Sequence, residues 1–269
     1  MKRIEAQKPN ISIESNKEKL SIANTIFFNT RFNFINQHNG LRPNKMHVFV
    51  APTHVGKSTL THALIDDLLI NNNGMKILLY LTEETLDDFE TAISRFVLDA
   101  KRINENLTVM VEDKTCSDQE IMESIEDRLM HTEYHLLVVD NITTSKLYMD
   151  REVKTQSSVA VWFKGLLTDT TLFLIAHTAS NNYNNELLDE TSIRGSKTIS
   201  NISEFLYVMQ PVRMNNFLRQ YIRVIKHRGQ EPDNKFFKLI YDSELRTISR
   251  DEPCEFEDFK AVFKLRNKL

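Results

Sequence analysis

Short apolar runs recur along the chain and are separated by segments that mix apolar and polar residues. Each run is nearly continuous, which is the pattern expected for strands covered on both faces of a sheet. The runs lie at residues 48–50, 77–81, 108–111, 136–139, 171–176, 205–209 and 221–225. Strands that alternate with helices predict an α/β fold with a mostly parallel, doubly wound sheet.

In the segments between these runs, apolar residues recur at helical intervals. Leu86, Phe89 and Ile93 are separated by three and four residues, and similar intervals occur within 121–129 and 159–166. Such spacing places apolar side chains on one face of a helix. Ligands of doubly wound sheets bind at the carboxyl ends of the strands, so polar residues that follow the apolar runs are the first candidates for a site.

A loop with the features of a phosphate-binding loop follows the first apolar run. It ends in Gly-Lys-Ser and leads into an expected amphipathic helix. Backbone N–H groups and the helix N-terminus would hold phosphate oxygens, Lys57 would reach the β- and γ-phosphates, and the Ser58 hydroxyl would ligate Mg²⁺. The usual first glycine is Ala51 here. The candidate nucleotide-binding residues are Ala51, Pro52, Thr53, His54, Val55, Gly56, Lys57, Ser58 and Thr59.

Ionisable residues end three further runs. Asp140 is the candidate to hold Mg²⁺ through water opposite Ser58. Glu83 is the candidate base that activates the attacking water, with the adjacent Glu84 as the competing choice. Both glutamates could instead be negative charges near a helix N-terminus. His177 could report the γ-phosphate through a hydrogen bond, or could be a capping or core histidine.

Two cations follow the run at 221–225. Lys226 and Arg228 occupy alternate positions and therefore the same side of a strand end. Such a pair could stabilise transition-state charge on a nucleotide in a neighbouring subunit. Solvated cations of an edge strand are the alternative.

Composition limits the classes of partner. The chain has 269 residues, 34 basic and 37 acidic side chains and a net charge of −3, so it has no global basic field, and any nucleic-acid contact must come from local loops. The two cysteines have no metal-type spacing, and neither a secretory signal nor a membrane span is recognisable. We therefore expect an intracellular, cytoplasmic protein with no membrane partner.

The expected domain organisation has three parts. Residues 1–39 form an N-terminal arm that includes a linker helix at 18–35, which packs on its own domain or on a neighbour. Residues 40–250 form the ATPase domain. Residues 251–269 form a C-terminal tail, with a short amphipathic helix at 256–265.

Taken in order, these motifs resemble the RecA-type motor domain of hexameric replicative DNA helicases, the DnaB family and the phage and mitochondrial primase-helicases. The resemblance covers about residues 40–249. The matching segments are Ala51-Pro-Thr-His-Val-Gly-Lys-Ser58, Leu81-Thr-Glu-Glu-Thr85, Val138-Val-Asp-Asn141, Ile175-Ala-His177, Ser192-Ile-Arg-Gly-Ser196 with Phe205-Leu-Tyr-Val-Met209, and Lys226-His-Arg-Gly229.

The resemblance implies an ATP- and Mg²⁺-dependent helicase motor that translocates on single-stranded DNA as a homo-oligomeric ring, expected to be a hexamer. In that family the arginine of the Lys-x-Arg pair, here Arg228, acts across the subunit boundary. Two loops would contact DNA, with the candidate cations Lys146, Arg151, Lys154, Arg194 and Lys197. Because no primase region or N-terminal collar is recognisable, a separate primase or loader is expected, and a lone motor domain rich in Lys and Asn suits a phage or mobile element.

Two other classes remain open from the sequence. One is a recombination or strand-exchange ATPase of the same fold, which ranks second because such proteins lack the Lys-x-Arg strand end. The other is a helicase loader or adaptor that uses ATP as an assembly switch.

Overall fold

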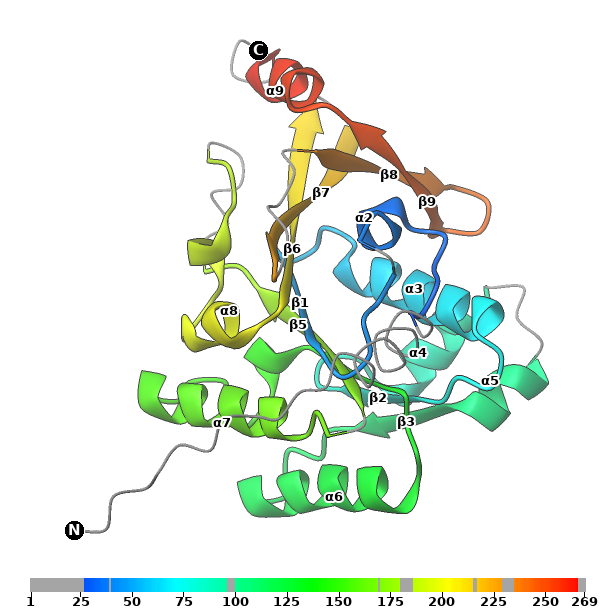
Figure 1. Cartoon of the computed structure of the whole chain (residues 1–269), viewed down its shortest axis with the longest axis vertical. Coiled ribbons are helices and arrows are strands. Elements are labelled where there is room, and N and C mark those ends of the chain that lie inside the picture. Colours follow the sequence, from blue (N-terminus) through cyan, green and yellow to red (C-terminus); the bar gives the residue numbers. More distant parts are fainter. Residues whose placement is uncertain are drawn as a thin grey trace, which may run out of the picture.

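The computed structural model describes residues 27–38, 40–95, 100–168, 170–179, 186–214, 217–228 and 235–265. Its centre is one sheet (Figure 1). The strands are β1 (Met46–Ala51), β2 (Ile77–Leu81), β3 (Leu107–Val111), β4 (Leu136–Asp140), β5 (Thr171–His177), β6 (Phe205–Met214), β7 (Phe217–His227), β8 (Phe236–Asp242) and β9 (Thr247–Cys254).

The sheet has two halves of different pairing. Its order is β3-β2-β4-β5-β1-β6-β7-β8-β9. The strands from β3 to β6 pair in parallel, whereas β7, β8 and β9 extend the sheet with antiparallel pairs. The predicted α/β fold with a mostly parallel sheet is therefore confirmed, and the antiparallel extension is an addition to it.

Helices cover both faces of the parallel half (Figure 1). These helices are α2 (Asn33–Asn36), α3 (Lys57–Asn71), α4 (Leu86–Ile93), α5 (Ala100–Asn106), α6 (Asp118–His131), α7 (Val153–Gly165) and α8 (Thr198–Ile202), whereas α9 (Phe256–Leu265) packs on the antiparallel strands. Figure 1 shows α2 to α5 on one side of the parallel strands and α6 to α8 on the other.

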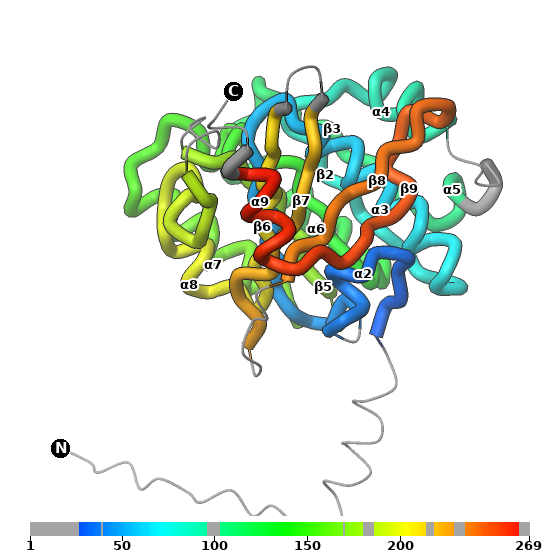
Figure 2. The backbone as a smooth tube through the Cα atoms, turned by 90° about the horizontal axis from the view of Figure 1, so that it is seen from above, coloured from blue at the N-terminus to red at the C-terminus, as the bar shows by residue number. Residues whose placement is uncertain are grey.

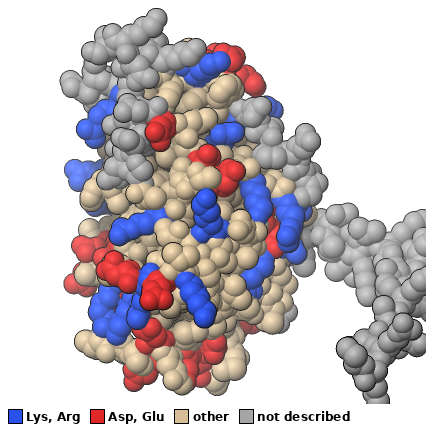
Figure 3. Space-filling view, turned by 90° about the vertical axis from the view of Figure 1, so that its left-hand side faces the viewer, with Lys and Arg blue, Asp and Glu red and all other residues tan. Residues whose placement is uncertain are grey.

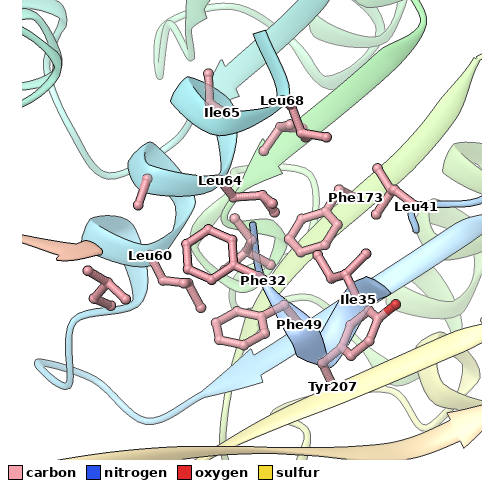
Figure 4. Packing of buried hydrophobic residues seen from close by; sticks show 14 of the residues in the cluster. Phe32, Ile35, Leu41, Phe49, Leu60, Leu64, Ile65, Leu68, Phe173 and Tyr207 are labelled. Atoms are coloured by element: carbon pink, nitrogen blue, oxygen red, sulfur yellow. The ribbon is translucent and has the colours of Figure 1, made fainter. Parts of the chain in front are cut away.

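The two layers explain why the strands read as continuous apolar runs. Successive side chains of a strand point to opposite faces, so Phe49 packs into the cluster under α3 while Val48 and Val50 pack into the cluster under α7. Figure 4 shows the first cluster, where Phe49 and Phe173 of the sheet lie against the inner side of α3. Both faces of β1 are fully buried, which fixes the position of the loop that follows it.

The helix after that loop is not amphipathic, contrary to the expectation from sequence. Nearly every residue of α3 from Leu60 to Leu69 is buried. The reason is that α3 packs on the central strands and is also contacted by α4, α5 and the edge strand β9 of the same sheet. Its buried carboxylates, Asp66 and Asp67, lie 3.7 and 3.9 Å from Nη1 of Arg31.

The N-terminal segment differs from the expected linker helix. Residues 18–26 lie outside the described residues; within the part that is described, 27–32 are not helical and Asn33–Asn36 form the short α2. The Asp251 carboxylate of β9 accepts the backbone N–H groups of Asn33 and Phe34 at 2.6 and 2.8 Å. With Phe34 and Ile35 fully buried, this described part packs on its own domain.

The C-terminal region continues the sheet. The boundary expected between residues 250 and 251 falls within β9, because Asp251 and Pro253 still pair with β8. The helix predicted at 256–265 is confirmed as α9, and Figure 2 shows it beside β6 and β7. Phe259 anchors it by stacking on Phe236, with ring centroids 3.9 Å apart.

Among the described helices, none has the length and apolar character needed to cross a membrane.

Candidate functional site

The carboxyl ends of four adjacent parallel strands form one edge where the candidate residues meet. Strand register places Ala51 beside His177 and Leu81 beside Asp140. The sheet order β2-β4-β5-β1 therefore sets Glu83, Asp140, His177 and the loop after Ala51 side by side. Residues more than a hundred positions apart in sequence share this edge because parallel strands all point their ends the same way.

The loop between β1 and α3 lines a cavity of about 440 Å³. Gly56 precedes the helix with φ of +87°, a left-handed conformation that favours glycine. The orphan N–H groups of the first turn of α3 start at this point, which makes the loop suited to an anion. The cavity is lined by Thr53, His54, Gly56, Lys57, Ser58, Thr59, Glu83 and His177. The remaining loop positions, Ala51, Pro52 and Val55, are buried beneath it.

Lys57, Glu83 and His177 contact one another in this cavity. Nζ of Lys57 lies 2.7 Å from Nε2 of His177 and 3.3 Å from Oε2 of Glu83. His177 Nε2 is 3.5 Å from the second oxygen of Glu83. Burial and then the charge of Lys57 lower the pKa of His177 to about 4, although Glu83 opposes the shift. His177 is therefore neutral at pH 7 and can accept a hydrogen bond from the Lys57 ammonium.

Asp140 is a buried carboxylate without a hydrogen-bond partner. It is 3% exposed, and neither side-chain oxygen has a partner among the described residues. Burial raises its pKa to about 6, with the charge of Lys57 opposing and that of Glu84 reinforcing the shift. Buried polar atoms are normally satisfied, and oxygen ligands are what Mg²⁺ prefers. The unpartnered oxygens of Asp140 fit a hydrated Mg²⁺ held between this strand end and Ser58.

The two adjacent glutamates face different neighbours. Glu83 contacts Lys57 and His177, as described above, whereas Oε2 of Glu84 lies 3.1 Å from Nε2 of His62 on α3. The Ser58 hydroxyl is among the groups that act on Glu84. Burial raises the pKa of Glu84, but the contacts with His62 and Ser58 outweigh it and hold the pKa below its ordinary value.

Three further side chains shape the site and were not predicted from sequence. The Asn141 amide lies 3.2 Å from Nε2 of His177, and its Oδ1 accepts the N–H of Thr143 at 2.8 Å. Gln220 of β7 donates to the backbone carbonyl of Val55. His62 is the third. His62 lies one helical turn after Ser58, and this spacing could have predicted its place near the site. Gln220 belongs to a strand distant in sequence, so no sequence pattern predicted its contact with the loop.

The five candidate DNA-contacting cations fall into two groups. Lys146 and Arg151 are held by the chain itself: Nζ of Lys146 donates to the carbonyls of Lys114 and Cys116, and Nη2 of Arg151 lies 2.7 Å from each carboxylate oxygen of Asp118.

The other three candidate cations, Lys154, Arg194 and Lys197, are exposed. Figure 3 shows the face that forms the left-hand side of Figure 1, where basic side chains are scattered among uncharged and acidic ones. The basic side chains visible on this face therefore do not join into one basic surface.

Lys226 and Arg228 lie at the other edge of the sheet. β7 is antiparallel to β6, so its end pairs with Phe205, and Phe205 in turn pairs with His47 near the start of β1. Nζ of Lys226 donates to the carbonyls of Ser200 and Asn201 at the end of α8, at 2.8 and 3.0 Å.

Arg228, the second cation of this pair, has a side chain that is 67% exposed and lies 3.5 Å from Glu204. Gly229 lies outside the described residues. The pair cannot serve the phosphate loop of its own chain from this edge.

The comparisons with known proteins show the fold. No family model and no curated protein matches the sequence. Among solved structures, a KaiC-like protein from the hyperthermophilic archaeon Pyrococcus horikoshii OT3 is similar over 85% of this chain and 99% of its own, with a TM-score of 0.67 at 15% identity. The chain has the RecA-like, KaiC-like P-loop fold. At this identity the likeness concerns the fold alone.

Proposed function

We propose that the protein is a Mg²⁺-dependent ATPase that acts as a DnaB-like helicase motor on single-stranded DNA. The observation that carries the proposal is the meeting of Lys57, Glu83 and His177 in one cavity beside the unpartnered carboxylate of Asp140. A RecA-like fold without hydrolysis would not need a buried ammonium, a base and a metal-type carboxylate at one strand edge.

Each residue of the cavity has a distinct part in this proposal. The Lys57 ammonium and the N–H groups at the start of α3 bind the phosphate oxygens. Glu83 lies at the mouth of the cavity with its side chain one-third exposed, and accepts the proton of the attacking water. His177, held between Lys57 and Asn141, contacts the terminal phosphate.

Ser58 and Asp140 would hold Mg²⁺. When bound, the metal neutralises charge that develops on the phosphate oxygens. The buried position of Asp140 keeps its carboxylate free of competing hydrogen bonds until the metal arrives.

The position of Arg228 supports a site shared between subunits. Its guanidinium is exposed at the edge opposite its own phosphate loop, and its backbone N–H is fixed to the carbonyl of Glu204 at 2.9 Å. A neighbouring subunit's nucleotide is the substrate that such a cation can reach. Hydrolysis then depends on assembly, which we propose to be a ring, loaded onto DNA by a separate protein.

A direct connection runs from His177 to the second candidate DNA loop. The backbone N–H of Arg194 donates to the carbonyl of His177 at 2.9 Å. Ser196 donates to the hydroxyl of Tyr148 in the other loop at 2.8 Å. Gly195 has φ of +92° and approaches Tyr148 so closely that a Cβ would lie 2.7 Å from its ring. A shift of His177 on hydrolysis would therefore move both loops together.

The test is steady-state ATPase activity with and without single-stranded DNA, together with the mass of the assembly. We expect an oligomer whose ATP turnover rises with DNA, and loss of turnover in Lys57→Ala. An inert monomer under both conditions would contradict the motor proposal.

An ATP-dependent assembly switch is the second candidate, and the engagement of Lys146 and Arg151 by the chain itself favours it. A loader or adaptor of this kind would assemble with ATP and hydrolyse it slowly, and single-stranded DNA would leave its turnover unchanged. The same assay therefore separates the two candidates.

A further inference from the structure

Glu84 approaches the Ser58 side of α3. It contacts His62, which lies one helical turn beyond Ser58 on this helix, and the Ser58 hydroxyl helps to lower its pKa. Both oxygens of Asp140, in contrast, lack a hydrogen-bond partner. A serine that ligates a metal gives the metal an oxygen lone pair, so its proton must point to an acceptor. Glu84 is placed to be that acceptor, which leaves Asp140 available for the metal.

Glu84 is in turn contacted by a buried histidine of α3. Nε2 of His62 lies 3.1 Å from Oε2 of Glu84, and neither atom has another partner among the described residues. His62 is 4% exposed and its ring meets Phe89 of α4 edge-on, with centroids 5.1 Å apart. The imidazole therefore has a fixed position one helical turn beyond Ser58.

We propose that His62 and Glu84 form a relay that orients the Ser58 hydroxyl toward Mg²⁺, with His62 as the positioning residue. The inference rests on the proposed nucleotide–Mg²⁺ site and assigns the two neighbouring glutamates separate duties. Glu83 serves the water and the phosphate side, and Glu84 serves the metal side. Outer partners that orient a metal ligand commonly change metal affinity by roughly 10- to 100-fold when they are removed.

The experiment measures metal and nucleotide affinity separately. Binding of Mn²⁺ to the protein with the non-hydrolysable analogue AMP-PNP is followed by electron paramagnetic resonance, and binding of AMP-PNP alone by calorimetry in EDTA. For His62→Phe, which keeps a ring against Phe89 and removes the donor, we expect Mn²⁺ affinity to fall by about 10- to 100-fold with AMP-PNP affinity in EDTA unchanged.

Four further variants test whether the effect is specific to the proposed relay. His62→Gln restores a side-chain N–H near the position of Nε2, so Mn²⁺ affinity should recover most of the loss. Glu83→Gln should abolish turnover and leave Mn²⁺ affinity intact, while Glu84→Gln should weaken Mn²⁺ binding. Thr61→Ala, whose hydroxyl bonds only the backbone of Lys57 at 3.1 Å, controls for general damage to α3.

The outcomes separate the inference from the function on which it rests. Wild-type protein that binds no AMP-PNP would refute the nucleotide site itself. Wild-type protein that binds Mn²⁺ with AMP-PNP while His62→Phe binds it equally well would overturn the relay alone. An equal loss of both affinities in His62→Phe would also overturn it, because that result indicates a structural role.

Discussion

Asp140 combines an unsatisfied carboxylate with complete burial, so its charge opposes folding. The ordinary pKa of 3.8 rises to about 6 in the folded chain. Between about pH 4 and pH 6 the unfolded chain releases this proton while the folded chain keeps it, so the free energy of unfolding falls as pH rises through that window.

Asp140→Asn should therefore stabilise the metal-free protein while abolishing Mg²⁺-dependent turnover. We expect its free energy of unfolding at pH 7.5 to exceed that of the wild type by roughly 1–3 kcal/mol. Urea unfolding in EDTA at pH 7.5 and pH 4 measures the effect, and the gain should shrink at pH 4. A variant less stable than the wild type at pH 7.5 would contradict the unpartnered state of this carboxylate.

His227 gives the opposite pH dependence. Burial, then the charges of His38 and Arg42, lowers its pKa to about 4, and its ring lies tilted against that of His38 with centroids 4.3 Å apart. As pH falls from about 6.5 to 4, this histidine binds a proton in the unfolded chain but not in the folded chain. The free energy of unfolding therefore decreases in acid.

His227→Phe keeps an aromatic ring against Phe205 and cannot titrate. Relative to the wild type, we expect it to retain up to about 3 kcal/mol more stability at pH 4.5 than at pH 7.5. Chemical denaturation of both proteins at the two pH values gives the difference, in which the contributions of carboxylates such as Asp140 cancel. A pH-independent difference would show that His227 titrates normally.

Among the structural elements, the loop after β4 is held by one buried carboxylate. Glu112 at the end of β3 accepts from the Tyr80 hydroxyl at 2.5 Å, the Ser145 hydroxyl at 2.6 Å and the Lys146 backbone at 2.9 Å, and pairs with Lys114 at 2.7 Å. Its side chain is fully buried, so replacing the charge leaves these donors poorly satisfied.

Glu112→Gln should destabilise the protein by about 2–4 kcal/mol and speed hydrogen exchange in residues 142–151. Urea unfolding and exchange mass spectrometry test both effects. Glu123→Gln on the exposed face of α6 is the matched control and should change neither. Exchange that stays unchanged in the Glu112 variant would mean that other contacts fix the loop.

The strands that could be predicted most directly from the sequence are those that are buried on both faces. β1, β2, β4 and β5 are covered on both faces, so their runs and polar ends could be read directly. β8 and β9 escaped because each is covered more on one face than the other, and because β9 carries Asp251 and Pro253 among its residues. α3 was misjudged because its outer face is covered by elements far away in sequence.

The residues of the candidate site likewise divide into those that the sequence predicted and those that depend on long-range contacts. Residues at strand ends, such as Asp140 and His177, were predicted because parallel strands bring their ends together. Glu83 was preferred to Glu84 only because it lies nearer the strand end; the sequence could not show that Glu84 is the one that contacts His62. Likewise, the intramolecular partners of Arg151 depend on loop conformation that the sequence does not encode locally.

Considering the whole molecule, the placement of Arg228 away from Lys57 makes a prediction about mixed assemblies. Arg228→Ala and Asp140→Asn should each be inactive alone, the first with nucleotide binding intact. In a random 1:1 mixture, an intact site meets an intact cation at about one interface in four. ATP turnover that reappears on mixing would support a shared site; turnover that stays absent after confirmed subunit exchange would argue that Arg228 has no role in trans.

The separation of these two groups across the sheet also restricts the symmetry of any active assembly. A two-fold dimer could bring the edge that carries Arg228 against the edge that carries Lys57 at both sites only if one continuous interface included both edges. A contact between unlike surfaces has no such requirement, and repetition of such a contact either closes on itself or continues as a helix. The last subunit of an unclosed assembly would then hold a nucleotide that no neighbour can help to hydrolyse.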